Sequence, residues 1–309
     1  MKSEPDADVA RPDPGLWRAW AALCITGVAW GTTQPLSRIA METGHHPIGV
    51  ALLNAVICLL LLVAILVLRG NTLPVTRRHL GFYLACGFLG TALPNGLSFQ
   101  AYTVLPVGIV SMVIACVPMA TLLLAWLMRV ERPDRRRQIG LCLGLAAMAM
   151  LALPESSLPQ AVAALWLILP MVVVCAYAAE NVYIAMARPP GLDALTVLTG
   201  LFAGAVLLLL PVAAALDAWV DPRALGPAER AIAVISVLHI LAYGGFVWLI
   251  GRAGPVFASQ TGYIVTATGV LGGMLAFGEQ HSEWVWLALA TLFVGLTLVR
   301  PRNNTQDQG

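Results

Sequence analysis

A single carboxylate, Glu180, lies within a long apolar stretch that has no other charged residue between Glu155 and Arg188. Asn181 follows it directly. Removing a carboxyl from water favours its protonated form, so a group in this position is able to carry a coupling proton or to bind a polar ligand. A second interpretation stays open, in which Glu180 lies near a helix end and pairs with Arg188.

Amide side chains accompany prolines at two other places in the apolar sequence. Gln34 precedes Pro35, and Asn95 follows Pro94. Proline in a helix leaves a backbone carbonyl without its usual donor, and an adjacent amide is able to bind a polar ligand there. Gln100 follows Asn95 by about one and a half helical turns. A simple kink with the amide bonded to a neighbouring helix is the alternative for Gln34.

Aromatic and imidazole side chains complete the candidate binding residues. His239 and Tyr243 are four residues apart, which places them on one face of a helix, and an unperturbed histidine titrates near neutral pH. Gln260 and Tyr263 lie in a later apolar segment, and Trp30 lies deep in the first. Each of these groups also suits ordinary contacts between helices, and for His239 a hydrogen-bonded packing role is the alternative.

The sequence offers no catalytic or metal-binding constellation. The five histidines are scattered without HExxH or HxxxH spacing, and no GxxxxGK[ST] nucleotide motif occurs. The six cysteines all lie in apolar segments without a CxxC pair, which favours core packing over a disulfide or zinc site. We therefore expect no enzymatic activity, no metal and no cofactor. The net charge of +2 argues against nucleic acid as a partner.

Charged residues occur in short clusters separated by long uncharged stretches. Only 11% of the 309 residues are charged, and no Asp, Glu, Lys or Arg occurs from His79 through Met128. A soluble domain averages about 25% charged residues, whereas one charge at the centre of a bilayer costs about 2.5–3.5 kcal/mol on insertion scales. The pattern predicts a multi-pass membrane protein whose surface contacts lipid.

Ten apolar stretches approach the length that a membrane crossing requires. A crossing takes about 20 apolar residues, and continuous apolar runs favour helices over the alternating strands of a barrel. The sequence thus predicts an all-α membrane protein with these helices: Trp17–Ala40, Pro47–Leu68, Leu80–Tyr102, Pro106–Met128, Gln138–Leu153, Ala161–Ala187, Ala194–Leu216, Ala231–Gly251, Gly254–Gly278 and Glu283–Val299.

The basic residues orient these helices. With a cytoplasmic N-terminus, Arg38, Arg223 and Arg230 are the only basic residues among the 18 Lys and Arg that fall outside the cytoplasm. Basic residues accumulate in cytoplasmic loops, so both termini are predicted to be cytoplasmic. The run Arg135–Arg137 is expected to enforce this orientation and to contact anionic lipid.

The second half of the sequence repeats the first with an offset of about 148 residues. Residues Leu105–Ser111 run parallel to Ala253–Ser259, and each stretch enters a long apolar helix that ends near a glutamate, Glu131 or Glu279. Each half holds five predicted helices, and an odd number forces the halves into opposite orientations. Inverted repeats are typical of secondary transporters, which bind substrate between the halves near the midplane.

Several local features fit one known family. They are the ten-helix layout, the step Trp30-Gly31-Thr32, a fourth helix that ends before Glu131, and the segment Phe277-Gly278-Glu279. Their order and spacing resemble the EamA-type proteins of the drug/metabolite transporter superfamily over about residues 17–300. One departure is that Pro118, in the middle of the fourth helix, has Thr266 as its counterpart in the second half.

The resemblance divides the chain into five parts. Residues 1–16 are predicted to be a disordered cytoplasmic tail, 17–153 a first EamA-like five-helix repeat and 154–160 an external linker. Residues 161–300 form the second repeat, and 301–309 a cytoplasmic tail.

The resemblance implies a carrier of the bacterial inner membrane, commonly an exporter of amino acids or other small metabolites by alternating access. The scarcity of charges inside the membrane favours a neutral or zwitterionic cargo. A channel or non-transporting scaffold and an integral-membrane enzyme acting on lipid stay open as alternatives. The patterns Gly140xxxGly144 and Gly269xxxGly273 suit close helix packing within a monomer or across a homodimer.

Overall fold

The computed structural model describes residues 14–130, 134–152, 164–280 and 283–298, and these residues form helices and short connections without strands. The all-helical prediction is thereby confirmed. The α-helices are α1 (Pro14–Glu42), α2 (Pro47–Leu68), α3 (Arg77–Gly87), α4 (Leu93–Val104), α5 (Val107–Ile114), α6 (Val117–Leu127), α7 (Arg135–Ala152), α8 (Ile168–Ala187), α9 (Ala194–Ala215), α10 (Pro227–Ala253), α11 (Pro255–Ser259), α12 (Thr261–Phe277) and α13 (Glu283–Leu298).

Six helical stretches in the described part of the chain are long and apolar enough to cross a membrane. In a bilayer every backbone N–H and C=O must be paired within the protein, which continuous helices achieve. The count of ten crossings and the inverted relation of the two halves stay predictions. The six stretches are Pro47–Leu68, Arg77–Val104, Val107–Leu127, Ile168–Ala187, Ala194–Ala215 and Pro227–Ala253.

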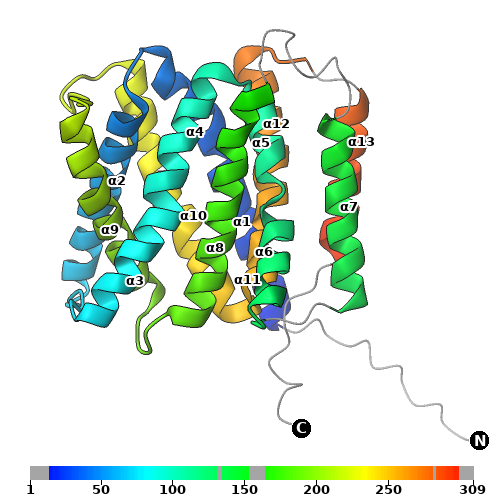
Figure 1. The fold of residues 1–309 in the computed structure, drawn as a ribbon, viewed down its shortest axis with the longest axis horizontal. Helices are drawn as coiled ribbons and strands as arrows, with labels where there is room; N and C mark the ends of the chain where they lie inside the picture. Colours follow the sequence, from blue (N-terminus) through cyan, green and yellow to red (C-terminus); the bar gives the residue numbers. More distant parts are fainter. Residues whose placement is uncertain (1–13, 131–133, 153–163, 281–282, 299–309) are drawn as a thin grey trace, which may run out of the picture.

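The helices run roughly parallel in one bundle (Figure 1). Helix α1 packs mainly against α10 and α12, while α9 packs against α2 and α3. Helices α7 and α13 pair with each other at one edge of the bundle, and α7 makes few contacts with the remaining helices.

Small residues bring helices from distant parts of the sequence into close contact. A Cβ atom at Gly31 of α1 would overlap with Thr268 of α12, and one at Gly204 of α9 would overlap with the backbone of Tyr83. Inside a membrane the hydrophobic effect does not drive helices together, so close approach of their backbones stabilises the contact instead. The bundle core therefore depends on glycine at these contacts.

Two predicted helices are interrupted along their length. The stretch predicted as Pro106–Met128 breaks between α5 and α6, just before Pro118, which lacks a backbone N–H. The stretch predicted as Gly254–Gly278 breaks at Gln260, between α11 and α12. In addition, a π-helix over Phe88–Ala92 joins α3 to α4, and the N–H of Leu93 bonds to the carbonyl of Phe88, five residues earlier.

Several predictions fall outside the described residues. These are the linker 154–160, the tail 301–309, most of the tail 1–16 and the residue Glu131. At the N-terminal boundary, α1 begins at Pro14, before the expected Trp17.

Candidate functional site

A small cavity of about 50 Å³ lies in the centre of the bundle, where both interrupted helices break. It can hold a few water molecules, since one water needs about 10–15 Å³, whereas pockets for small-molecule ligands measure about 300–1,000 Å³. The structure therefore has a closed centre. The lining residues are Trp30, Gln34, Ile114, Val117, Tyr177, Asn181, Phe246, Ser259, Thr261, Gly262 and Val265.

Polar groups without a hydrogen-bond partner gather around this cavity. Gln34 Oε1, Thr261 Oγ1 and Gln260 Oε1 are buried and unpaired. Gln260 uses its amide nitrogen to donate to the carbonyl of Val256, 3.1 Å away, in the last turn before the break. Leaving a buried polar atom unpaired costs about 1–3 kcal/mol. Unpaired groups beside a cavity are what a binding site for a polar ligand or for water requires.

Trp30 of α1 forms one wall of the cavity. Its ring lies 4.8 Å from that of Tyr243, 5.5 Å from that of Phe246 and 5.9 Å from that of Tyr177, measured between centroids. These contacts hold the indole against α8 and α10 and fix its orientation. The predicted candidates Trp30 and Tyr243 are thus brought together.

Asn181 of α8 faces the cavity together with Tyr177, four residues earlier on the same helix face. Its amide nitrogen donates to the hydroxyl of Thr121 on α6, 3.0 Å away. The amide oxygen of Asn181 is able to serve a ligand in the cavity. Helix α8 thereby links the central cavity to α6.

Glu180 faces a different side of α8, toward the π-helix. Its side chain is only 1% exposed, and neither carboxyl oxygen has a hydrogen-bond partner. The carboxyl lies so close to Gly90 that a Cβ atom there would overlap with it. The carbonyl of Gly90 accepts a hydrogen bond from the hydroxyl of Tyr243, and Cys86 also lies near enough to interact electrostatically with Glu180.

The surroundings of Glu180 distinguish a position inside the bundle from pairing with Arg188 at a helix end. Arg188 donates to the carbonyl of Leu192 in the connection after α8, while the glutamate lies inside the bundle. An unpaired carboxylate that is fully buried costs several kcal/mol, so the geometry favours a neutral, protonated group. This arrangement matches the interior placement rather than the pairing with Arg188.

The remaining candidates lie away from the cavity. His239 Nδ1 is 3.0 Å from Asn54 Oδ1, and Asn54 donates to the hydroxyl of Ser236, 2.9 Å away. This buried network joins α2 to α10, which is the packing role considered for His239. Gln100 is half-buried and donates to Thr103, 3.2 Å away in its own helix.

Two further candidates are buried without lining the cavity. Asn95 follows the π-helix, and its amide nitrogen is unpaired. Tyr263 points toward α7, where its hydroxyl would collide with a Cβ atom on Gly144. The role of Asn95 and Tyr263 in binding therefore stays a prediction.

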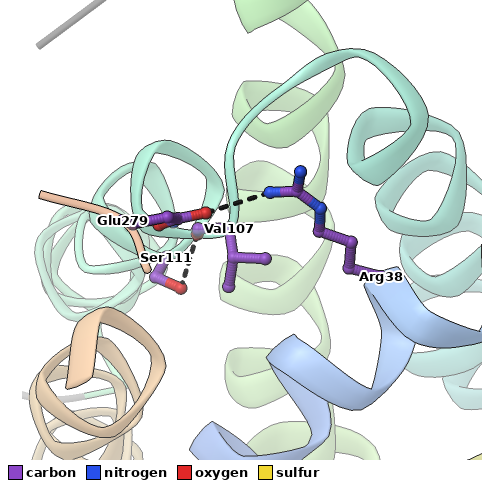
Figure 2. A network of polar contacts seen from close by, with 5 residues as sticks. Arg38, Val107, Ser111 and Glu279 are labelled. Atoms are coloured by element: carbon purple, nitrogen blue, oxygen red, sulfur yellow. Dashed lines mark hydrogen bonds and ion pairs between the residues drawn. The ribbon is translucent and has the colours of Figure 1, made fainter. Parts of the chain in front are cut away.

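An ion pair closes the end of the bundle at which α1 finishes; we name it the external end, after the orientation predicted from the basic residues. Arg38 of α1 lies 3.0 Å from Glu279, which follows α12. Glu279 also accepts the backbone N–H of Gly108 at the start of α5, 3.4 Å away. The Arg38 guanidinium lies 4.5 Å from the ring centroid of Phe277. Figure 2 shows Arg38 reaching across to Glu279 above Ser111.

The opposite end of the bundle, named the cytoplasmic end, is hollow. A hollow of about 610 Å³ lies where α8 and α10 end and α11 begins. Ile184, Arg188, Arg252 and Gly254 are among its lining residues. The two ends of the bundle therefore differ in how tightly they are closed.

Comparison with known proteins shows similarity to membrane transporters. Residues 17–153 match the EamA-like transporter family. The match covers less than half of the chain. It is also similar to the protein described as "Uncharacterized inner membrane transporter YedA" in three strains of Escherichia coli, with 28% identity over 91% of this chain and 90% of the relative.

A solved crystal structure shares the fold. It superposes with a TM-score of 0.67 at 16% identity and covers 92% of this chain and 96% of its own. The family match, the similarity to YedA and the membrane-length helices support the sequence prediction of a multi-pass transporter of the inner membrane.

The range that matches the EamA-like family supplies only part of the central cavity. Trp30, Gln34, Ile114 and Val117 come from within residues 17–153, and the other lining residues follow that range. Sequence reasoning missed the contributions of Tyr177 and Thr121. Tyr177 carried a usable signal, because it lies one turn before Asn181 on the same face. Thr121 carried none, since its role depends on how α6 packs on α8.

Proposed function

We propose that this chain is a secondary carrier that exports small neutral or zwitterionic metabolites, such as amino acids or related compounds, by alternating access. In this proposal ten crossings form two five-helix halves of opposite orientation. The halves rock around the central cavity. Energy comes from an ion gradient or from the substrate gradient, because the sequence has no nucleotide-binding motif.

The observation that carries the proposal is the central cavity at two helix breaks. Carriers often bind substrate at midplane between interrupted helices, whose freed backbone groups are available to the ligand. Here α5 and α6 meet α11 and α12 at the cavity, and unpaired oxygens of Gln34 and Thr261 adjoin it. A volume of about 50 Å³ corresponds to a closed state, which has to widen for a metabolite to enter.

The chemistry of the lining supports the cargo class. The cavity is lined by amides, hydroxyls and aromatic rings, without an ionisable group other than Tyr177. Gln34 and Asn181 are suited to bind polar groups, and Trp30 and Phe246 to contact an apolar side chain or an ammonium group. A cargo of net charge would be left uncompensated at this depth.

Alternating access also needs closures that open in turn. The pair Arg38–Glu279 joins α1 and the start of α5 to the segment after α12. Opening the external end requires this pair to separate, while the hollow near Arg188 leaves the other end less tightly packed. The structure fits a carrier closed toward the outside.

Glu180 is proposed as the group that couples transport to protons. The titratable side chains near it are Cys86 of α3, Tyr243 of α10 and Tyr177 on its own helix. The residue adjacent to it, Asn181, faces the cavity. Release of the proton would place a negative charge beside the Gly90 carbonyl, and the resulting repulsion favours movement of α8 away from the π-helix.

Transport is tested by reconstitution. An untargeted comparison of metabolites exported by cells with and without the chain identifies the cargo, which is then measured in liposomes containing the purified protein. A carrier gives saturable flux and counterflow of labelled substrate. Unsaturable conductance would indicate a channel, and no flux of any exported metabolite would indicate a scaffold.

The variant Glu180→Gln tests the coupling. We expect it to fold normally, because glutamine resembles the protonated carboxyl, and to lose the dependence of transport on a pH gradient. Glu229→Gln, at the external end, serves as the matched control and should keep that dependence. Normal pH-dependent transport by Glu180→Gln would remove Glu180 from the mechanism.

A further inference from the structure

A cleft of about 910 Å³ lies between α6 and α7, outside the central cavity. It exists because α7 packs on α13, where Gly295 approaches the backbone of Gly140, and makes few contacts with α6. Figure 1 shows α7 and α13 set apart at the edge of the bundle. The walls of the cleft are apolar and include Leu123, Leu127 and Leu141.

The cleft has the depth of one membrane leaflet. On α6 it extends from Met119 to Leu127, a rise of about 12 Å at 1.5 Å per residue. One half of a hydrocarbon core of about 30 Å is close to this value. Trp126, which is 58% exposed, lines the cleft near its cytoplasmic end, and tryptophan favours the boundary between hydrocarbon and headgroups.

Positive charge lies at the cytoplasmic end of the cleft. Arg129 and Gln138 line this end, and Arg135–Arg137 form the first turn of α7. Between positions 129 and 137 the sequence has five arginines and two carboxylates. One of those carboxylates, that of Asp134, accepts the backbone N–H of Arg137 at 2.8 Å. The positive charge at this end therefore complements an anionic lipid headgroup.

The backbone holds Arg129 at the mouth of the cleft in an unusual conformation. Arg129 has a φ of 57°, in the left-handed region that normally favours glycine directly after a helix. For other residues this conformation costs about 1–2 kcal/mol. Glycine would satisfy the backbone better but would leave the mouth of the cleft without its cation.

We propose that the α6–α7 cleft binds an anionic phospholipid of the cytoplasmic leaflet, with an acyl chain against Leu123 and Trp126 and the phosphate at Arg129. The lipid fills the space that α7 leaves open and ties α7 and α13 to the rest of the bundle. This inference is independent of the proposed cargo and of proton coupling.

The test uses the purified full-length protein and native mass spectrometry with phosphatidylglycerol or phosphatidylcholine as the added lipid. The wild type should bind phosphatidylglycerol more tightly. Arg129→Gly should lower this preference about fivefold, which corresponds to about 1 kcal/mol for one basic residue at an anionic surface. Arg129→Lys should keep the preference, and Arg223→Gln, in a loop at the external end, is the control.

A second variant tests the apolar wall. Cys142→Phe fills the cleft and should reduce binding of both lipids. Glycine adopts the left-handed conformation of position 129 without strain, so the thermal stability of Arg129→Gly in detergent should equal or exceed that of the wild type. A loss of lipid binding in this variant would then not be caused by unfolding. Unchanged phosphatidylglycerol binding in both variants would overturn the proposal. A lipid-independent dimer that Cys142→Phe dissociates would also overturn it, since the occupant would then be a second copy.

Discussion

The two ends of the bundle are closed by different means. At the external end Glu279 contacts both a guanidinium and a backbone N–H, and these bonds join α1, α5 and the segment after α12. At the cytoplasmic end a hollow of about 610 Å³ separates the ends of α8 and α10, and Arg188 bonds only within its own connection among the contacts of the described residues. Discrete polar bonds close the external end, whereas the cytoplasmic end has a hollow lined by Arg188 and Gly254.

This difference indicates which end of the bundle a polar bond keeps closed. A charge-assisted hydrogen bond contributes about 1.5–3 kcal/mol, so a single bridge such as Arg38–Glu279 is able to keep one end shut against thermal motion. The side chains of this pair are 34% and 13% exposed, which places its contribution between that of a surface pair and that of a buried one. Among the described residues, no ion pair of this kind closes the cytoplasmic end.

The largest expected effect follows from removing the external bridge. Arg38→Gln should raise the rate at which an external thiol reagent modifies Ser111→Cys, placed beneath the bridge in an otherwise cysteine-free protein, by about tenfold, the equivalent of about 1.4 kcal/mol. The charge-swapped double variant Arg38→Glu with Glu279→Arg should restore slow modification, and Arg230→Gln is the surface control. Equal rates in all variants would show that the bridge does not close this end.

An intermediate effect should distinguish the glycines at the two ends. Gly254, at the cytoplasmic end, has φ 86° and ψ 161°, a region that is essentially restricted to glycine. Gly278, at the external end, has φ 64° and ψ 24°, which asparagine tolerates. Gly254→Asn should therefore destabilise the protein by about 1–3 kcal/mol and Gly278→Asn by less, measured as thermal unfolding in detergent. The reverse order would contradict this account of the cytoplasmic turn.

The smallest effect concerns the helix cap beside the cytoplasmic hollow. The Asp193 carboxylate accepts the N–H of Thr196 at 2.8 Å, and this bond, with Arg69 and Arg188 nearby, lowers the pKa of Asp193. Because the folded pKa is depressed, the stabilisation is present above the ordinary value of about 3.9 and is lost as the pH falls through the folded value. Asp193→Ala should cost about 1 kcal/mol at pH 7.

The pH dependence of this cap provides its own control. The difference in unfolding temperature between wild type and Asp193→Ala should shrink when the pH is lowered below the pKa of Asp193. Asp193→Asn, which also caps well, should lose less stability at pH 7 and show a weaker pH dependence. A difference that stays constant from pH 7 to pH 3 would assign the effect to packing rather than to the carboxylate.

The sequence predicted those features that depend on local composition. The boundaries of α2, Pro47–Leu68, were predicted as observed, and α9 differs by one residue, because long uncharged runs reveal helices directly. Glu180 stands out in the sequence for the same reason. Its separation from Arg188 also has a local cause, since eight residues along a helix span about 12 Å and the arginine donates to the Leu192 carbonyl after α8.

Contacts between distant segments could not be predicted in this way. Arg38 and Glu279 are 241 positions apart, and only the packing of α1 on α12 brings them together. The break at Gln260 has no proline to mark it, unlike the break before Pro118. The placement of His239 beside Asn54 likewise depends on how α10 crosses α2.

The π-helix between α3 and α4 accommodates one residue more than a regular α-helix would in the same rise. Deleting a single residue within Phe88–Ala92 would let the segment close as an ordinary α-helix. Every residue from Pro94 onward would then rotate by about 100° around the axis. Asn95 would turn toward another neighbour, and the Gly90 carbonyl would no longer meet Tyr243, so one inserted amino acid sets the angular register of an entire half-helix.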